Sequence, residues 1–144
     1  MEDIEILKNV AKVDKNILVI GAGLVGLDCV SGLLEYDVNI IVVEMAEWML
    51  VKQLDKKAAK TYQEAFVKKG VIQYYGTGIT EVVLDGAGNA VSVILGNGTE
   101  VSCEYIVVTA GVRSNISFLE GTGIEINRFG LVYVCRSTDI KQCI

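Results

Sequence analysis

The sequence predicts a three-layer α/β domain, with a central parallel sheet, helices, and a three-stranded antiparallel β-meander as one crossover. The first observation is a pair of continuous apolar runs, at 16–21 and 38–44, which are typical of strands buried on both faces. The second is the helical spacing of apolar residues at 23–36 between them, which gives a unit of the size of a parallel βαβ motif. The third is a series of short β-rich runs after residue 78, separated by spacers that contain glycine and asparagine.

The next helix and strand of this pattern follow directly. Residues 55–69 predict an amphipathic helix, with Asp55 suited to its N-terminal cap and Gly70 to its end. Its expected buried face consists of Ala58, Ala59, Tyr62, Ala65 and Phe66. The run at 71–75 is expected to form the third strand of the parallel sheet.

The β-rich part predicts the meander and a return to the parallel sheet. Runs at 79–85, 90–95 and 100–103 form the three antiparallel strands, with hairpin turns at "GAGN" and "GNGT". The apolar run at 105–110 suits a further parallel strand. Towards the C-terminus, 123–134 predicts two short strands around a turn at 128–130.

The length of 144 residues favours one domain spanning 1–144, in which residues 1–14 form a lead-in helix or linker. The net charge is −5 and no basic patch is present, so nucleic acid and acidic membrane surfaces are not expected partners. No apolar run reaches the roughly 18 residues that a membrane span needs. Hydrophobic residues make up 51% of the chain, which is enough for a substantial core.

The cysteines do not predict a metal or disulfide framework. The four cysteines, Cys29, Cys103, Cys135 and Cys143, form no C-x-x-C pair, and the chain has no histidine to complete a zinc site. We expect Cys29 and Cys103 to be small buried hydrophobic residues rather than redox groups. A reducing, cytoplasmic location fits this cysteine usage.

The stretch "VIGAGLVGLDC" contains three glycines in the order G-x-G-x-x-G, directly after a predicted strand and at the start of a predicted helix. In this context Gly21 permits a tight turn, Gly23 lets a pyrophosphate approach the backbone, and Gly26 lets helix and strand pack closely. The helix N-terminus then offers free N–H groups and a partial positive charge to phosphates. The expected contacts in this loop are Gly21, Ala22, Gly23, Leu24, Val25 and Gly26.

Glu44 supplies the second part of a dinucleotide site. It ends the second apolar run, 23 positions after Gly21 (44 − 21), where a carboxylate accepts hydrogen bonds from both ribose hydroxyls. It would also repel a 2′-phosphate, and the residues from Met45 to Trp48 include no lysine or arginine to hold one. The pattern therefore favours NAD(H) over NADP(H), with Met45 beside the site. The alternative is that the glycines form only a tight corner and that Glu44 is a solvated strand end.

From about Lys15 onward, the chain resembles the NAD(H)-binding domain of the FAD-dependent pyridine nucleotide–disulfide oxidoreductases. "KNILVIGAGLVGLD" resembles the second dinucleotide fingerprint of that family, "IIVVE" its next strand, and "QLDKKAAKTYQEAFVKKGV" its next helix. "VVTAGVRSN" is similar to a segment that usually reads A-x-G-x-x-P-N, with Ser114 in the place of the usual proline. The resemblance implies a Rossmann-like fold in which the meander replaces a crossover helix.

The same resemblance implies roles for two more residues and for cofactors. The backbone of Gly111 would face the dinucleotide, and Asp28 occupies a position that is commonly a glutamate near the nicotinamide–flavin contact. Alternatively, Asp28 is a solvated carboxylate that interacts with the helix dipole. FAD would be held by another domain of the same polypeptide, so the chain is expected to be an internal domain of a longer flavoprotein. By itself it would bind NADH weakly, contain no catalytic residue and catalyse nothing.

Three other functions stay open from the sequence. A self-sufficient dehydrogenase is disfavoured because the chain has no histidine and no tyrosine with a lysine four residues later. A non-catalytic NAD-binding sensor would need a partner surface, and the FAD-binding half of the same family would use the same glycine loop. The apolar cluster of Trp48, Met49 and Leu50 is expected either to pack under its own loop or to contact adenine or another domain.

Overall fold

The computed structural model describes residues 14–112, 114–119 and 121–126. The chain divides into two units, residues 1–110 and residues 111–144. Of the second unit, the described part contains one short 3-10 helix, η1 (Ser117–Leu119). The predictions for residues 1–13, for Cys135 and Cys143, and for the strands after residue 126 lie outside the described residues.

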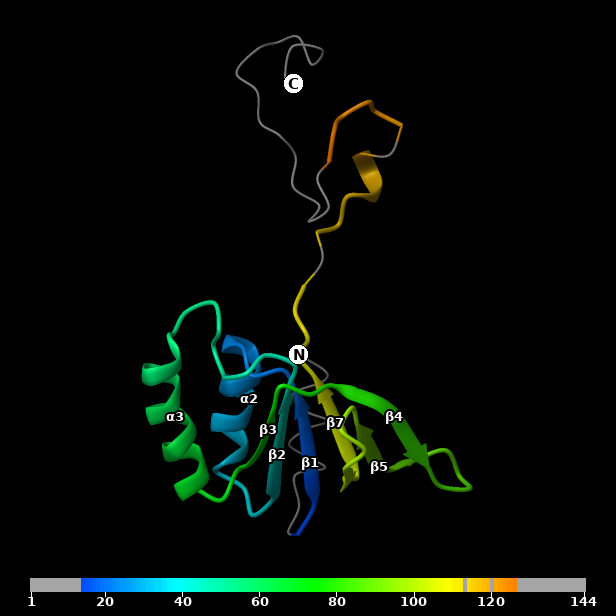
Figure 1. The fold of residues 1–144 in the computed structure, drawn as a ribbon. Helices are drawn as coiled ribbons and strands as arrows, with labels where there is room; N and C mark the ends of the chain where they lie inside the picture. The colour runs from blue at the N-terminus through cyan, green and yellow to red at the C-terminus, as the bar shows by residue number, and fades with distance from the viewer. Residues whose placement is uncertain (1–13, 113, 120, 127–144) are drawn as a thin grey trace. The chain divides into compact units, whose positions relative to one another are not determined.

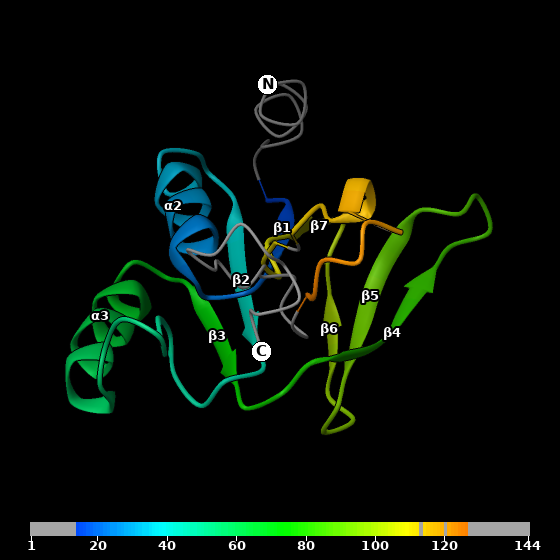
Figure 2. The ribbon, with the colours of Figure 1, turned by 90° about the horizontal axis from the view of Figure 1, so that it is seen from above.

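The first unit contains a four-stranded parallel sheet with the strand order β3-β2-β1-β7 (Figures 1 and 2). Its strands are β1 (Asn16–Ile20), β2 (Asn39–Glu44), β3 (Ile72–Tyr75) and β7 (Tyr105–Val108). The helices are α2 (Leu24–Leu33) and α3 (Lys56–Lys68). The predicted βαβ unit and the predicted return of the chain to the parallel sheet at β7 are both confirmed.

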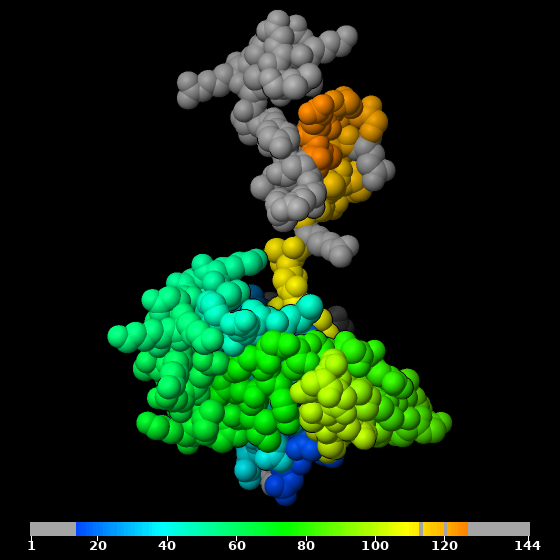
Figure 3. All heavy atoms as spheres, in the orientation of Figure 1, coloured from blue at the N-terminus to red at the C-terminus, as the bar shows by residue number. Residues whose placement is uncertain are grey.

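The predicted meander is also confirmed. Strands β4 (Ile79–Leu84), β5 (Ala90–Leu95) and β6 (Glu100–Ser102) form a separate antiparallel sheet in that order. Figure 2 shows this sheet on one side of the parallel sheet and both helices on the other. The space-filling view shows the green segment that leads from β3 towards β4, between α3 and the meander (Figure 3). The fold is therefore a three-layer α/β arrangement in which the meander is a crossover.

Alternate residues of the central strands fill two cores, which explains their continuous apolar sequences. From β1, Ile17 and Val19 join the helix-side core, whereas Leu18 joins the meander-side core. Strand β2 divides in the same way. The helix-side core also contains Leu27, Val30, Leu33 and Ala59, and the meander-side core contains Val93, Leu95, Val101 and Cys103.

Helix α3 corrects one prediction. Asp55 caps it as expected, since its Oδ1 accepts a hydrogen bond from the Ala58 N–H at 2.8 Å. However, Tyr62 is 54% exposed and Ala65 is also exposed, so they do not belong to the buried face. The inward stripe consists of Ala59, Gln63 and Phe66, with Ala58 partly buried. The apolar pattern was misleading because the polar Gln63 occupies the middle of this stripe, at the spacing of four and three that a helix face requires.

The two described cysteines are free thiols. Cys103 is fully buried in the meander-side core, and Cys29 is partly buried against the helix-side core. Burial raises the pKa of both thiols, and the neighbouring charges of Asp28 and Glu104 add to this effect. The expectation of burial is therefore confirmed for Cys103 and in part for Cys29. Among the described residues, no helix is long and apolar enough to cross a membrane.

Candidate functional site

The glycine loop, residues 21–26, consists of the connection from β1 to α2 and the first residues of α2, at the carboxyl end of the parallel sheet. Gly21 has a φ of +106°, and a Cβ atom at this residue would lie 2.8 Å from the carbonyl oxygen of Thr109. At Gly26, a Cβ atom would lie 2.0 Å from the carbonyl oxygen of Gly21 and 2.7 Å from the Thr109 hydroxyl. The fold itself therefore requires glycine at both positions.

Gly23 differs from these two glycines. Its φ is −80°, a value that any residue adopts, and a Cβ atom here would meet nothing within 4 Å. Nothing in the described chain therefore requires glycine at this position. The space beside Gly23 is open, which is the geometry that a ligand in contact with the backbone needs.

The N-terminus of α2 has free backbone donors at this open position. Gly23 is the N-cap, no described side chain caps the helix, and the first turn contains no acidic residue. Leu24 and Val25 are 63% and 71% exposed. The first N–H groups of a helix have no intrahelical acceptor, and the helix dipole adds a partial positive charge. This helix end suits an anionic group.

Glu44 ends β2 beside the loop, as predicted. Its Oε2 atom accepts a hydrogen bond from the Ala22 N–H at 2.7 Å, and its Oε1 atom accepts one from the Ala46 N–H at 2.8 Å. Each carboxylate oxygen has a second lone pair, so the group keeps acceptor capacity for ligand hydroxyls. Glu44 is therefore not merely a solvated strand end, because it holds the glycine loop.

The remaining expected contacts have different surroundings. Ala22 is fully buried, and its carbonyl oxygen accepts a hydrogen bond from the Leu50 N–H at 2.9 Å. Met45 is 80% exposed just after β2, and Asp28 is exposed on α2. Gly111 belongs to the second unit and has a φ of +98°. The structure thus brings Gly21, Ala22, Gly26 and Glu44 into one hydrogen-bonded or packed group.

Two residues of this group were not predicted from the sequence. Thr109 follows β7, and its hydroxyl donates to the carbonyl oxygens of Ile20 and Gly21 at 2.8 Å and 3.2 Å. Leu50 has a φ of +52°, a left-handed conformation that its sequence neighbours do not indicate. The "VVTAG" resemblance pointed to the end of β7, but it singled out Gly111 rather than Thr109.

The apolar cluster of Trp48, Met49 and Leu50 packs under its own loop, which is the first of the two predicted arrangements. Met49 is fully buried in the helix-side core, and Trp48 and Leu50 pack against that core. The indole N–H of Trp48 donates to the Leu54 carbonyl oxygen at 3.1 Å. The Lys56 ammonium lies 5.8 Å from the centroid of the Trp48 ring.

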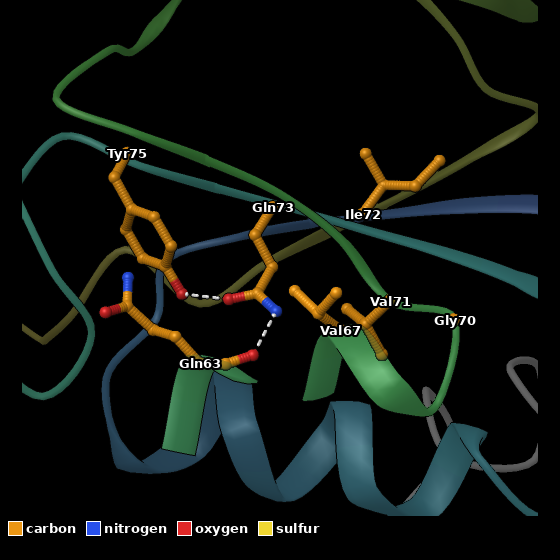
Figure 4. A pocket seen from close by; sticks show the side chains of 7 residues that line it. All are labelled: Gln63, Val67, Gly70, Val71, Ile72, Gln73 and Tyr75. Atoms are coloured by element: carbon orange, nitrogen blue, oxygen red, sulfur yellow. Dashed lines mark hydrogen bonds between the residues drawn. The ribbon is translucent and has the colours of Figure 1, made fainter. Parts of the chain in front are cut away.

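A hollow lies between α3 and the edge strand β3, away from the glycine loop (Figure 4). It is an open space of about 590 Å³, lined by Gln63, Val67, Gly70, Val71, Ile72, Gln73 and Tyr75. The Tyr75 hydroxyl donates to Gln73 Oε1 at 2.7 Å, and Gln73 Nε2 donates to the Gln63 carbonyl oxygen at 3.0 Å. Burial, with the nearby charge of Glu44, raises the pKa of Tyr75 to about 12. None of the predicted site residues lines this hollow, so the glycine loop remains the better candidate.

Comparisons with known proteins agree with this fold. Residues 2–138 match the sequence profile of the pyridine nucleotide-disulphide oxidoreductases. The chain is 33% identical over 131 residues to the assimilatory nitrate reductase electron transfer subunit of Bacillus subtilis, covering 89% of this chain and 16% of that protein. It is 29% identical over 135 residues to peroxisomal monodehydroascorbate reductase 2 of Oryza sativa subsp. japonica, covering 88% of this chain and 28% of that protein.

Among solved structures, the NAD-dependent persulfide reductase from A. fulgidus is similar, with a TM-score of 0.79 and 26% sequence identity. The match covers 93% of this chain and 24% of that one. The chain thus spans less than a third of the length of each of these three relatives. The extent of the profile match nevertheless identifies the family: this chain belongs to the pyridine nucleotide-disulphide oxidoreductases.

Proposed function

We propose that the chain is the NAD(H)-binding domain of an FAD-dependent oxidoreductase, and that it positions NADH beside a flavin held by another domain of the same polypeptide. The observation that carries this proposal is the open, uncapped N-terminus of α2 next to the carboxylate of Glu44. When both cofactors are bound, NADH supplies a hydride and the flavin accepts it.

The helix N-terminus would hold the pyrophosphate. The backbone N–H groups of the first turn point out of the helix end, and Gly23 offers no side chain to obstruct a phosphate. The exposed side chains of Leu24 and Val25 leave the charge of this helix end uncompensated. In this role the loop binds and orients its ligand and transfers no proton.

Glu44 would select a ribose with a free 2′-hydroxyl. Each of its oxygens already accepts one backbone hydrogen bond, which fixes the carboxylate, and each retains a lone pair for a hydroxyl. A 2′-phosphate would place a second anion beside this group, and neither Met45 nor Ala46 offers a positive charge. The arrangement therefore supports NAD(H) rather than NADP(H).

Three further contacts belong to the proposal by position or by family resemblance. Met45 is exposed directly after Glu44 and would line the adenosine side of the site. Asp28 would approach the nicotinamide, and the backbone of Gly111 would face the dinucleotide.

The test is a calorimetric titration of the purified chain with NADH, NADPH and FAD in separate experiments. We expect weak NADH binding, weaker NADPH binding, and no copurifying flavin, since the flavin belongs to another domain. Binding of FAD in preference to NADH, or a yellow purified chain, would assign the glycine loop to the flavin instead. No NADH binding at millimolar concentration would contradict the proposal.

A further inference from the structure

Thr109 connects the end of β7 to the glycine loop through two groups of its own. Its backbone N–H donates to the Ile20 carbonyl oxygen at 2.9 Å. Its hydroxyl lies 2.8 Å from the same oxygen and 3.2 Å from the carbonyl oxygen of Gly21. The hydroxyl has one hydrogen, so these two acceptors share it. Thr109, the residue directly after β7, therefore connects the end of this strand to the loop.

The Thr109 hydroxyl and Glu44 hold opposite ends of one peptide unit. The carbonyl oxygen of Gly21 accepts from Thr109, and the N–H of Ala22, in the same peptide bond, donates to Glu44 Oε2 at 2.7 Å. Because a peptide unit is planar and trans, bonds at its two ends fix the rotation of the whole plane. A loss at either end frees that rotation.

The next peptide unit is held in a similar way. The Ala22 carbonyl oxygen accepts from the Leu50 N–H at 2.9 Å, so the Gly23 N–H in the same plane points in the opposite direction. Gly23 is the N-cap residue of α2, so this N–H belongs to the open end of the helix. Two successive peptide planes before the helix are thus oriented by groups from other parts of the chain.

The Gly21 carbonyl oxygen has little space to move towards the helix. It lies 2.0 Å from where a Cβ atom of Gly26 would be, so only the hydrogen of a glycine fits between them. The Thr109 hydroxyl also contacts this corner, because it lies 2.7 Å from the same Cβ position. Thr109 therefore sets the position of the oxygen against which the first turn of α2 packs.

We propose that Thr109 is a positioning residue for the dinucleotide, whose hydroxyl orients the Gly21–Ala22 peptide and so aims the glycine loop at the pyrophosphate. The inference rests on the proposed NAD(H)-binding function. Thr109 acts indirectly: its hydroxyl donates to the carbonyl oxygens of Ile20 and Gly21, and together with Glu44 it fixes the Gly21–Ala22 peptide. Valine at this position would keep the shape of the side chain but would leave the Gly21 carbonyl oxygen facing a methyl group.

The test compares NADH affinity among four forms of the purified chain: wild type, T109V, T109S and D55A. T109S retains the hydroxyl, and D55A removes the α3 cap, which lies outside the glycine loop. All titrations are made well below the unfolding transition of each form. We expect T109V to bind NADH about fivefold more weakly, the equivalent of one neutral hydrogen bond. T109S should stay within about twofold of the wild type, since rescue needs only the hydroxyl.

The D55A variant separates positioning from general stability. It should unfold more easily than the wild type but bind NADH with the same affinity. Should T109V fail to fold, T109A removes the same hydroxyl and is compared in its place. Wild-type affinity in the hydroxyl-free variant, or equal weakening in T109S, would overturn the inference and leave the proposed function standing. Failure of the wild type to bind NADH would instead overturn the proposed function, and this inference with it.

Discussion

Gly26→Ala should destabilise the first unit strongly, because its added methyl group has no place to go. The new Cβ atom would lie 2.0 Å from the Gly21 carbonyl oxygen, whereas real Cβ contacts essentially never fall below 3.0 Å. The loop or helix must therefore move by at least 1.0 Å (3.0 − 2.0). The atom in the way is the backbone oxygen of Gly21, so a change of side-chain rotamer cannot relieve the clash and the backbone itself must shift.

The cost can be estimated from the bonds that this movement disturbs. Overpacking of a filled site costs about 1–3 kcal/mol. Displacement of the Gly21 carbonyl also strains its hydrogen bond from Thr109, and rotation of the same peptide strains the Ala22–Glu44 bond. A net loss of about 1 kcal/mol for each of these two bonds, added to the overpacking cost, gives a total of about 3–5 kcal/mol. That is a large part of the roughly 5–15 kcal/mol that stabilises a typical domain.

Urea unfolding measures this difference directly. The chain has one tryptophan, Trp48, which packs against the helix-side core, so its fluorescence reports on that core, and far-UV circular dichroism provides a second probe. Gly32→Ala is the matched control: Gly32 also lies in α2, but a Cβ atom there would meet nothing within 4 Å. We expect Gly32→Ala to be neutral or stabilising by up to about 1 kcal/mol. A Gly26→Ala variant within 1 kcal/mol of the wild type would refute the reasoning about this corner.

Two further perturbations test the surroundings of the site. Glu44→Gln replaces one acceptor oxygen by an amide donor that faces a backbone N–H, so urea unfolding should show a loss of about 1–2 kcal/mol. Titrations of this variant should also show a smaller preference for NADH over NADPH. Unchanged values of both the stability and the preference would contradict the role of the carboxylate. Tyr75 has a pKa of about 12 in the folded state, against about 10 in the unfolded state, so it keeps its proton more tightly when folded. The contribution of this neutral hydroxyl to the free energy of unfolding is therefore fully present below pH 10 and is lost as the pH rises through 12. Between pH 10 and 12 the wild type should therefore lose roughly 1 kcal/mol more stability than Tyr75→Phe, a reduced value because the ring is partly exposed. Parallel pH profiles of the two proteins would exclude this effect.

Between residues 16 and 108, local patterns in the sequence were sufficient to predict the helices and strands and their order. Apolar runs identified the strands buried on both faces, and glycine–asparagine spacers identified the meander turns, because these signals arise from neighbouring residues. The face of α3 was predicted incorrectly because Gln63 bonds to β3 through its backbone carbonyl oxygen while occupying the inward stripe. Hydropathy alone favours Tyr62 and Ala65 over a glutamine at such a position.

The support of the glycine loop could not be predicted in the same way. Thr109 lies 88 residues after Gly21 in the sequence, and only the return of β7 to the side of β1 brings them together. Leu50 adopts a left-handed conformation that favours glycine or asparagine, so its residue type gave no signal. Glu44 was predicted as a ligand contact, but its bonds to Ala22 and Ala46 depend on a loop geometry that a linear motif does not describe.

The central claim is that the open position at Gly23 admits a dinucleotide phosphate. The most direct measurement is the NADH affinity of Gly23→Ala beside that of Gly32→Ala, with urea unfolding of both variants. Both added methyl groups would project into open space in the free chain, so neither variant should suffer a clash. Gly23→Ala should lose about 1 kcal/mol of stability, because alanine is a poorer N-cap than glycine, and should still fold. We predict that Gly23→Ala loses NADH binding by at least about tenfold, a steric cost above 1.4 kcal/mol, while Gly32→Ala binds as the wild type does. Equal NADH affinity in the two variants would contradict the claim.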